Sequence, residues 1–446
     1  MNHSTMWRLA GPMIVSNISI ALLGLVDTAV VGHLGQPYYL GGIAIGAIIF
    51  DFIYWGMGFL RMSTTGLTAQ IHGQANNKAN NQDDNTACRT ILAQSLITAF
   101  LIAMIVLIFQ KHIADLALWL LEGSEEVTFY ARTYFEWSIW GAPAVLFLLV
   151  MTGWFLGMQN AKATLIVAVT VNIINVVLDF VFVFGLDMDV RGVALASVIS
   201  LYIGVFVAIF LVARELRINP GEWLIADILH MQRLKEILAL NQDIFIRTIC
   251  LIFVFAFFTR QGAKQGDVIL AANAILLNFQ ALMALGLDGF ANATEALVGK
   301  AVGAKNRKVF VDSVKTATFW SFVVAISFAL IFALVGKSMI NILTDILSIR
   351  AEAYQYLPWM ILSPIVAVWC FLLDGIFIGA TRAKEMRNSM LISTFLIFLP
   401  AWYVFQGYGN HGLWLAFIVF FVARGLTLAY ASLRIERDGG FIPIKY

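Results

Sequence analysis

Long apolar runs separated by short polar breaks cover nearly all of this 446-residue sequence. Most runs have about 20 residues or more, the length that an α-helix needs to cross the hydrocarbon of a bilayer. Short segments of alternating polarity, typical of a transmembrane β-barrel, are absent. The pattern predicts an all-α polytopic membrane protein with twelve transmembrane helices, over residues 8–32, 40–71, 90–110, 127–157, 162–185, 191–213, 239–262, 267–302, 309–336, 347–380, 385–406 and 411–434.

Basic residues are distributed unevenly between the two sets of connections. Of the 29 Lys and Arg residues, 19 lie at the N-terminal end, at the C-terminal end or beside the connections that follow even-numbered helices, and 7 lie on the other side. Basic residues accumulate on the cytoplasmic side of membrane proteins. We therefore expect both termini in the cytoplasm of a bacterial cell and the chain in its inner membrane. The start of the chain has no small-residue cleavage site, and it is interpreted as an uncleaved first helix.

An amphipathic stretch near the middle of the chain divides it into two halves. Residues 214–240 carry basic residues on a mixed face, and Pro220 and Gly221 lie near the start of this stretch. The pattern predicts an N-terminal six-helix lobe over 1–213, a cytoplasmic linker with an interfacial helix over 214–238, and a C-terminal six-helix lobe over 239–446.

The two halves resemble each other in sequence. At an offset of 230, residues 56–74 align with 286–304; at 222, TGWFLGMQNAKA (152–163) aligns with DGIFIGATRAKE (374–385); at 220, 191–197 aligns with 411–417. Three matches in order, at slowly falling offsets, indicate an internal repeat. An even number of helices per repeat predicts two bundles related by a pseudo-twofold axis along the membrane normal, around a central cleft, which is typical of transporters.

Composition excludes several classes of protein. Hydrophobic residues make up 60% of the chain, charged residues 13%, the net charge is +2 and the mean hydropathy is +0.84, so there is no sign of a nucleic-acid partner. The three cysteines are far apart and predict neither a disulfide framework nor a metal site. No phosphate-binding loop or hydrolase motif occurs, and we expect no enzyme activity and no cofactor. Energy for transport would then come from an ion gradient.

Acidic residues inside the spans of the first half are the main candidates for chemistry. A charged side chain within a span is costly and usually functional. Asp27 lies late in the first span, although it could instead face water at the outer end. Asn172, Asn175 and Asp179 share one face of the fifth span; Asn172 could also serve to hold two helices together. If Asp27 and Asp179 meet away from water, desolvation and like charge would permit their protonation near neutral pH, or their oxygens could instead bind Na⁺.

The second half offers fewer candidates. Its buried carboxylates are expected to be mainly Asp288, Glu295 and Asp374. Arg247 lies in the seventh span, and a pair of Arg247 with Asp374 or Asp288 could be either structural or functional. Asp374 aligns with Thr152 of the first half.

The motifs together resemble one known family. LVDTAVVGHLG at the end of the first span, NIINVVLD in the fifth, and the paired TGWFLGMQNA and DGIFIGATRA are similar to the MATE family of multidrug and toxic compound extrusion transporters, closest to its branch named for DNA-damage-inducible protein F. The resemblance covers essentially the whole chain. It implies two six-helix lobes around a V-shaped cleft and the exchange of H⁺ or Na⁺ for amphipathic, often cationic compounds.

The resemblance also implies a set of site residues. The family's coupling site in the N-terminal lobe falls on Asp27, Tyr134, Thr152, Asn175, Asp179 and Ser197, with Thr152 where Asn is common and Ser197 in place of Thr. Pro12 would let the first helix bend. A different branch binds Na⁺ at acidic residues of the C-terminal lobe. In this sequence only Asp374 matches one of those residues.

The sequence therefore predicts a monomeric, H⁺-coupled exporter of small amphipathic, cationic compounds. The alternatives are Na⁺ coupling at the same residues, or a flippase for lipid precursors from the related superfamily. Flippases of that kind tend to have a cationic cleft and extra helices, and neither is predicted here.

Overall fold

The computed structural model describes the chain except for residues 1–2, 33–36, 76–81, 122–123 and 443–446; the side chains of residues 23–38, 40, 75, 82 and 84 are also outside the description. In the described part, every regular element is a helix. Eleven of these helical segments are long and apolar enough to cross a membrane, and α1 (His3–Gly32) is a further helix of 30 residues. The all-α class and the twelve predicted spans are confirmed, and most helix ends fall close to the predicted positions.

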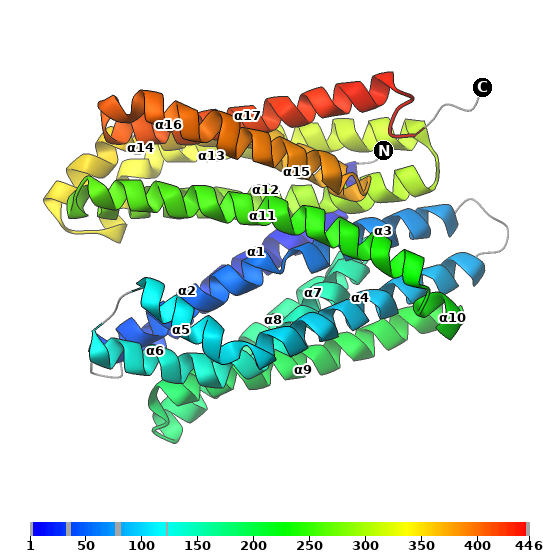
Figure 1. Cartoon of the computed structure of the whole chain (residues 1–446), viewed down its shortest axis with the longest axis horizontal. Coiled ribbons are helices and arrows are strands. Elements are labelled where there is room, and N and C mark those ends of the chain that lie inside the picture. Colours follow the sequence, from blue (N-terminus) through cyan, green and yellow to red (C-terminus); the bar gives the residue numbers. More distant parts are fainter. Residues whose placement is uncertain (1–2, 33–36, 76–81, 122–123, 443–446) are drawn as a thin grey trace. The chain divides into compact units, whose positions relative to one another are not determined.

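The chain forms two compact units, shown in Figure 1. The N-terminal unit comprises Val15–Ile237 and the C-terminal unit comprises Met1–Ile14 with Leu238–Tyr446. After α1, the helices up to the middle of the chain are α2 (Pro37–Gly56), α3 (Phe59–Ala75), α4 (Gln82–Ile108), α5 (Gln110–Leu121), α6 (Glu125–Ser138), η1 (Ile139–Gly141), α7 (Ala142–Gly157), α8 (Ala161–Asp179), η2 (Phe180–Gly185), α9 (Asp189–Ile218) and α10 (Ile225–Ile228). The rest are α11 (Met231–Lys264), α12 (Asp267–Gly303), α13 (Arg307–Leu343), α14 (Leu347–Gly379), α15 (Ala383–Leu391), η3 (Ile392–Phe398), α16 (Leu399–Phe405), η4 (Gln406–Tyr408) and α17 (Asn410–Arg437).

Helix α1 contributes its first residues to the C-terminal unit. The Trp7 ring lies edge-on to Phe290 and to Trp320, with centroids 5.2 Å apart in both pairs. Ile14 lies against Gly289 of α12. The division between the units therefore falls within α1, close to Pro12, whereas the sequence-based lobe 1–213 includes the whole helix.

The connection between the two halves contains less separate helix than the sequence predicts. Helix α9 continues to Ile218 and α11 begins at Met231, so α10 is a single turn. The amphipathic pattern of 214–240 thus belongs largely to the ends of two spans. Arg89 of α4 donates hydrogen bonds to the carbonyl oxygens of Leu216 (2.7 Å) and Asn219 (3.1 Å). These bonds give partners to carbonyl groups at the C-terminal end of α9 and hold the connection on the N-terminal unit.

The glycines of the repeated sequence motif pack in the same way in both units. A Cβ at Gly153 of α7 would lie 2.5 Å from the Arg61 carbonyl oxygen of α3, and a Cβ at Gly375 of α14 would lie 2.7 Å from that of Ala291 on α12. Residues 61 and 291 are related by the offset of 230. Small residues spaced four apart let helix backbones approach closely in membranes. The motif is therefore a packing device that the two halves share.

The turns after these glycines are also repeated. Gln159 and Thr381, related by the offset of 222, both have positive φ, at 63° and 55°. The next residue, Asn160 or Arg382, donates its backbone N–H to the carbonyl oxygen five residues earlier, at 2.8 Å in both units. The sequence repeat thus corresponds to repeated backbone geometry.

Replacing Gly379 with Ala is expected to destabilise the protein by about 1–3 kcal/mol, the usual cost of overpacking. Its new Cβ would lie 2.5 Å from the Glu295 carbonyl oxygen, a backbone atom that cannot turn aside. Gly11→Ala is the matched control, because no atom lies within 4 Å of a Cβ there. Thermal unfolding of the purified variants measures the difference, and equal melting temperatures for the two would contradict this packing.

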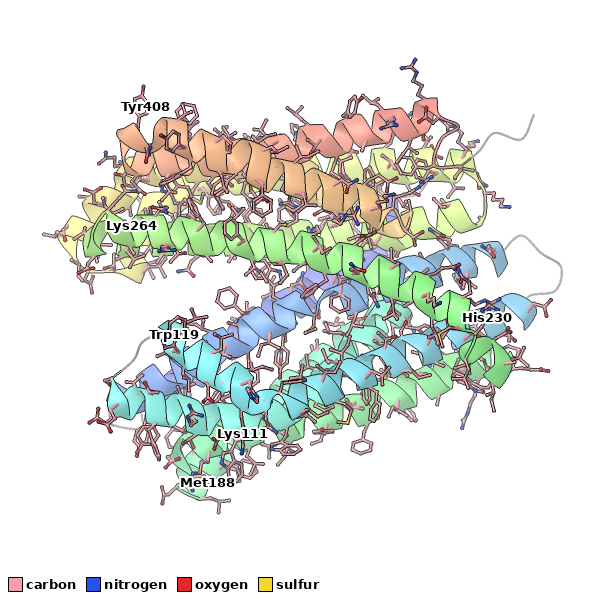
Figure 2. All side chains as sticks on the ribbon, viewed as in Figure 1. Lys111, Trp119, Met188, His230, Lys264 and Tyr408 are labelled. Carbon is pink, nitrogen blue, oxygen red and sulfur yellow. The ribbon has the colours of Figure 1, made fainter. Side chains whose placement is uncertain are left out.

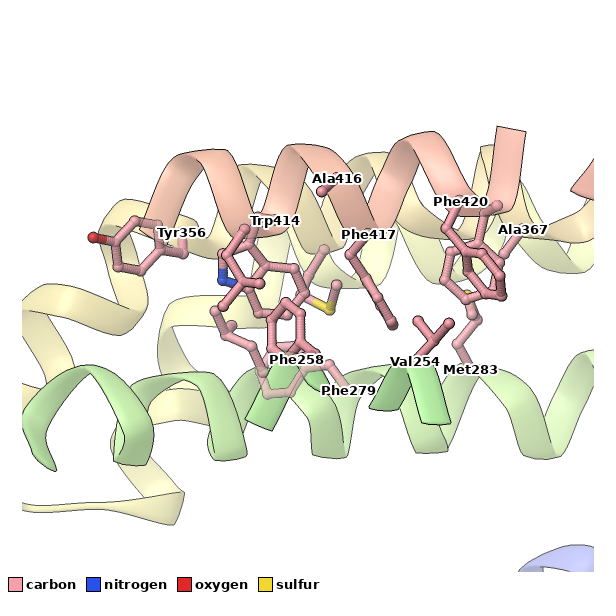
Figure 3. Packing of buried hydrophobic residues seen from close by; sticks show 14 of the residues in the cluster. Val254, Phe258, Phe279, Met283, Tyr356, Ala367, Trp414, Ala416, Phe417 and Phe420 are labelled. Atoms are coloured by element: carbon pink, nitrogen blue, oxygen red, sulfur yellow. The ribbon is translucent and has the colours of Figure 1, made fainter. Parts of the chain in front are cut away.

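Aromatic side chains fill the core of the C-terminal unit. Figure 3 shows Trp414 and Phe417 of α17 meeting Phe258 of α11. The Phe258 centroid lies 4.7 Å from that of Trp414 and 5.0 Å from that of Phe417. In Figure 2, Lys264 and Tyr408 lie at the same end of this unit, as expected for two connections predicted on the same side of the membrane. Large apolar side chains also cover outer surfaces, such as Leu334 and Ile342, both 83% exposed, as a lipid environment allows.

Candidate functional site

Helix α8 has a polar side that is buried and an apolar side that is exposed. Asn172, Asn175 and Asp179 are 9%, 1% and 0% exposed. On the other side, Ile173 and Val177 are 58% and 52% exposed. This is the reverse of a soluble amphipathic helix and matches a helix with lipid on one side and a polar interior on the other. The predicted face is therefore turned into the N-terminal unit.

Two hydrogen bonds connect the amides of this face to neighbouring helices. The Asn175 side-chain NH₂ donates to Ser197 Oγ of α9 at 3.1 Å, so the structure brings these two predicted residues together. The Asn172 NH₂ donates to Ser19 Oγ of α1 at 2.5 Å. Sequence reasoning did not single out Ser19, although it lies two turns before Asp27 on the same helix. Asn172 thus links α8 to α1, in agreement with its alternative role of holding two helices together.

Asp179 is the last residue of α8 and is followed by the π-helix η2. Wide helical turns of this kind are frequent at functional sites. Val183 of η2 belongs to the same buried cluster as Tyr134 of α6. Asp179 is thus a fully buried carboxyl at the point where the regular hydrogen bonding of the helix changes.

Tyr134 and Thr152 occupy different surroundings. Tyr134 is 9% exposed and lies over Gly46 of α2, where a Cβ would be 2.4 Å from the ring. Thr152 donates its hydroxyl to the Leu148 carbonyl oxygen of its own helix at 2.7 Å, so its hydrogen is not directed toward a ligand. The side chain of Asp27 lies outside the described residues, and its place in the site stays a prediction.

The C-terminal unit contains a buried ionic cluster around Asp374. Asp374 Oδ2 accepts a hydrogen bond from Arg247 Nη2 of α11 and another from Arg424 Nη2 of α17, the latter at 2.8 Å. The three residues are 7%, 7% and 4% exposed. The guanidinium of Arg424 also lies over the Phe420 and Phe421 rings, at 5.5 and 5.8 Å from their centroids. We call these three residues the Asp374 cluster.

The structure contains the predicted pair of Arg247 with Asp374, whereas the predicted burial of Asp288 is wrong. Arg247 does pair with Asp374, but a second arginine that the sequence analysis did not single out, Arg424, shares the carboxylate. Two guanidinium groups on one carboxylate oxygen repel a further cation. Glu295 is buried, as predicted, but Asp288 is exposed, because it lies on the face of α12 opposite the buried Gly286 and Phe290.

Both the sequence and the fold are similar to those of known proteins. The MatE family model matches residues 12–181 and 244–404. The chain is 43% identical over 443 residues to DNA damage-inducible protein F of Escherichia coli (strain K12), covering 98% of this chain and 94% of that protein. It is 22% identical to multidrug resistance protein NorM of Vibrio cholerae serotype O1, covering 95% and 94%.

Solved structures share the fold. A crystal structure of MATE in complex with MaD5 superposes with a TM-score of 0.85 at 19% identity, over 98% of this chain and 96% of that one. An outward-facing multidrug resistance MATE family transporter of the MOP superfamily gives the same TM-score, identity and coverage.

Proposed function

The chain belongs to the MatE family, and on that premise we propose that it is a secondary exporter that exchanges H⁺ for small amphipathic cations. Members of the family are transporters and not enzymes, and this chain is a multi-pass membrane protein. The proposal extends to a monomer in the bacterial inner membrane with both termini in the cytoplasm. The resemblance in sequence to a multidrug resistance protein supports small molecules as its substrates.

The single observation that carries the proposal is the buried polar face of α8. A carboxyl group that is 0% exposed in a membrane-spanning helix is costly to keep charged, so gaining a proton stabilises it. Asp179 would bind H⁺ when substrate is absent and lose it when a cationic substrate arrives, with Asn175 and Ser197 fixing the geometry around it. Asp27 would share this role, and Pro12 would let α1 bend between the two states.

The Asp374 cluster supports a coupling site in the N-terminal unit alone. Asp374 is the residue that matches a Na⁺-binding acid of another branch, but here Arg247 and Arg424 already neutralise it. The two positive charges of these arginines would repel a cation from the carboxylate. The C-terminal unit is therefore assigned a structural role, and the ion is assigned to Asp27 and Asp179.

Export driven by separately imposed gradients tests the proposal. The purified protein is reconstituted into liposomes with ethidium as the transported cation, and either a pH gradient or a Na⁺ gradient is applied. We expect the pH gradient alone to drive ethidium movement and the Na⁺ gradient alone to give the rate of protein-free liposomes. Transport driven by Na⁺ only would replace H⁺ coupling with Na⁺ coupling, and no ethidium movement with either gradient would contradict the export of amphipathic cations.

A further inference from the structure

A cavity of about 680 Å³ lies at one end of the C-terminal unit, between α15 with η3 on one side and α17 with the turn after it on the other. This is the end where Arg382, Lys384 and Arg434 gather, which the distribution of basic residues predicts to face the cytoplasm. None of these residues takes part in the proposed coupling site. The cavity is thus a separate feature of the molecule.

Three cationic and two acidic side chains line the polar part of the cavity. Arg382 pairs with Glu385 at 3.4 Å, and Arg434 pairs with Asp438 at 3.7 Å. Both arginine side chains are largely exposed, at 49% and 73%, and exposed pairs of this kind are weak and exchange readily. In the described part of the chain, Lys384 makes no ion pair. The lining therefore carries one positive charge in excess and two arginines that can turn toward a stronger anion.

The internal repeat shows what is distinctive about this cavity. In the N-terminal unit, Asn160 caps α8 by accepting from the Ala163 N–H at 3.2 Å and donates to Glu215 at 2.9 Å. The residues related to Asn160 and Glu215 by the repeat offsets are Arg382 and Ile435, and both line the cavity. Thus the amide and the acid of the N-terminal unit are replaced in the C-terminal unit by a cation and an apolar side chain. Helix α15 begins without a side-chain cap.

Apolar side chains from both sides line the part of the cavity that continues along the membrane span. Ile392, Leu426 and Tyr430 line it, and they are 41%, 66% and 69% exposed. A soluble anion would gain nothing from these side chains, whereas an acyl chain would cover them. The cavity combines a basic polar end near the ends of α15 and α17 with apolar lining farther along the span.

From this combination we propose that the cavity binds the phosphate headgroup of an anionic phospholipid of the inner leaflet. Arg382, Lys384 and Arg434 contact the phosphate oxygens, and Ile392 and Leu426 contact the first part of an acyl chain. Basic pockets between transmembrane helices on the cytoplasmic side are suited to such headgroups, because the charged groups meet at the surface and the chain stays in hydrocarbon.

Native mass spectrometry of the purified protein with added lipid tests this site. The wild-type protein is expected to retain dioleoyl phosphatidylglycerol in preference to dioleoyl phosphatidylcholine. The variant Arg382→Gln/Lys384→Gln/Arg434→Gln is expected to lose this preference. The variant Lys305→Gln/Lys308→Gln/Lys315→Gln removes the same charge from exposed positions outside the cavity and is expected to keep it. Thermal unfolding of both variants checks that they are folded.

Two results would overturn the proposal. One is an equal preference for phosphatidylglycerol in the cavity variant and the wild type, which would place lipid binding elsewhere. The other is displacement of the bound lipid by millimolar glycerol phosphate or inorganic phosphate, which would make the site one for soluble phosphate. For a site that binds headgroup and acyl chain together, we expect that neither glycerol phosphate nor inorganic phosphate displaces the lipid. We also expect the protein to retain a short-chain dihexanoyl lipid more weakly.

Discussion

Replacing Asp374 with Asn is expected to destabilise the protein by about 3–5 kcal/mol, the cost of removing one partner from a buried ion pair. The carboxylate accepts hydrogen bonds from two arginines, and its loss leaves both guanidinium groups buried without a counter-charge. We expect a large fall in the melting temperature of the purified protein. A second substitution, Arg424→Met, should recover part of the loss in the Asp374→Asn background, because it removes one of the two uncompensated charges.

Asp345→Asn is the control for this prediction. Asp345 pairs with Arg350 at 2.8 Å, but its side chain is fully exposed, so the same chemical change should lower the melting temperature much less than Asp374→Asn does. Equal effects of Asp374→Asn and Asp345→Asn would mean that the cluster does not stabilise the unit. Ethidium transport by the Asp374→Asn/Arg424→Met variant, driven by a pH gradient, would separate stability from coupling. Loss of transport in a folded variant would contradict the structural role assigned to Asp374.

Replacing Asp179 with Asn is expected to reduce pH-driven ethidium transport to the rate of protein-free liposomes while the protein stays folded. The amide has nearly the same shape as the carboxyl but cannot gain or lose a proton at physiological pH. Because Asp179 is fully buried, its neutral form fits the site without the cost of a buried charge. The variant should therefore unfold at a temperature no lower than the wild type.

The matched control is Glu126→Gln, at an exposed position near the start of α6 in the same unit. It makes the same acid-to-amide change and should transport normally. Asp179→Asn with wild-type transport would remove Asp179 from the coupling mechanism. A misfolded Asp179→Asn protein would instead indicate that the carboxylate is needed for packing, contrary to the role given to it here.

The sequence predicted the helices and the repeat well for physical reasons. In a membrane, each span must satisfy its own backbone hydrogen bonds, so apolar length alone determines where helices lie. The buried face of α8 was also predictable, since Asn172, Asn175 and Asp179 are polar residues at helical spacing in an otherwise apolar segment. The sequence analysis found the repeated glycines but did not predict their packing, although close helix packing needs small residues at a fixed spacing.

Contacts between residues distant in the chain could not be predicted in the same way. Arg424 lies 50 residues after Asp374, and nothing in the spacing indicates that it shares the carboxylate with Arg247. A sign was present, since Arg424 lies inside an apolar span and must find a counter-charge. Asp288 shows the opposite failure: its place within a span suggested burial, but its position around the helix leaves it exposed. The sequence predicted a longer interfacial helix than the structure contains, because the amphipathic ends of α9 and α11 resemble a separate helix.

The central claim is that substrate and proton compete for the carboxyl groups of the N-terminal unit. Proton release on substrate binding measures this directly: ethidium is added to the detergent-purified protein in weakly buffered solution, and the pH change is recorded. We expect that the wild type releases protons, that Asp179→Asn releases fewer or none, and that added Na⁺ does not substitute for ethidium. Ethidium binding by the wild type without any proton release would contradict this claim.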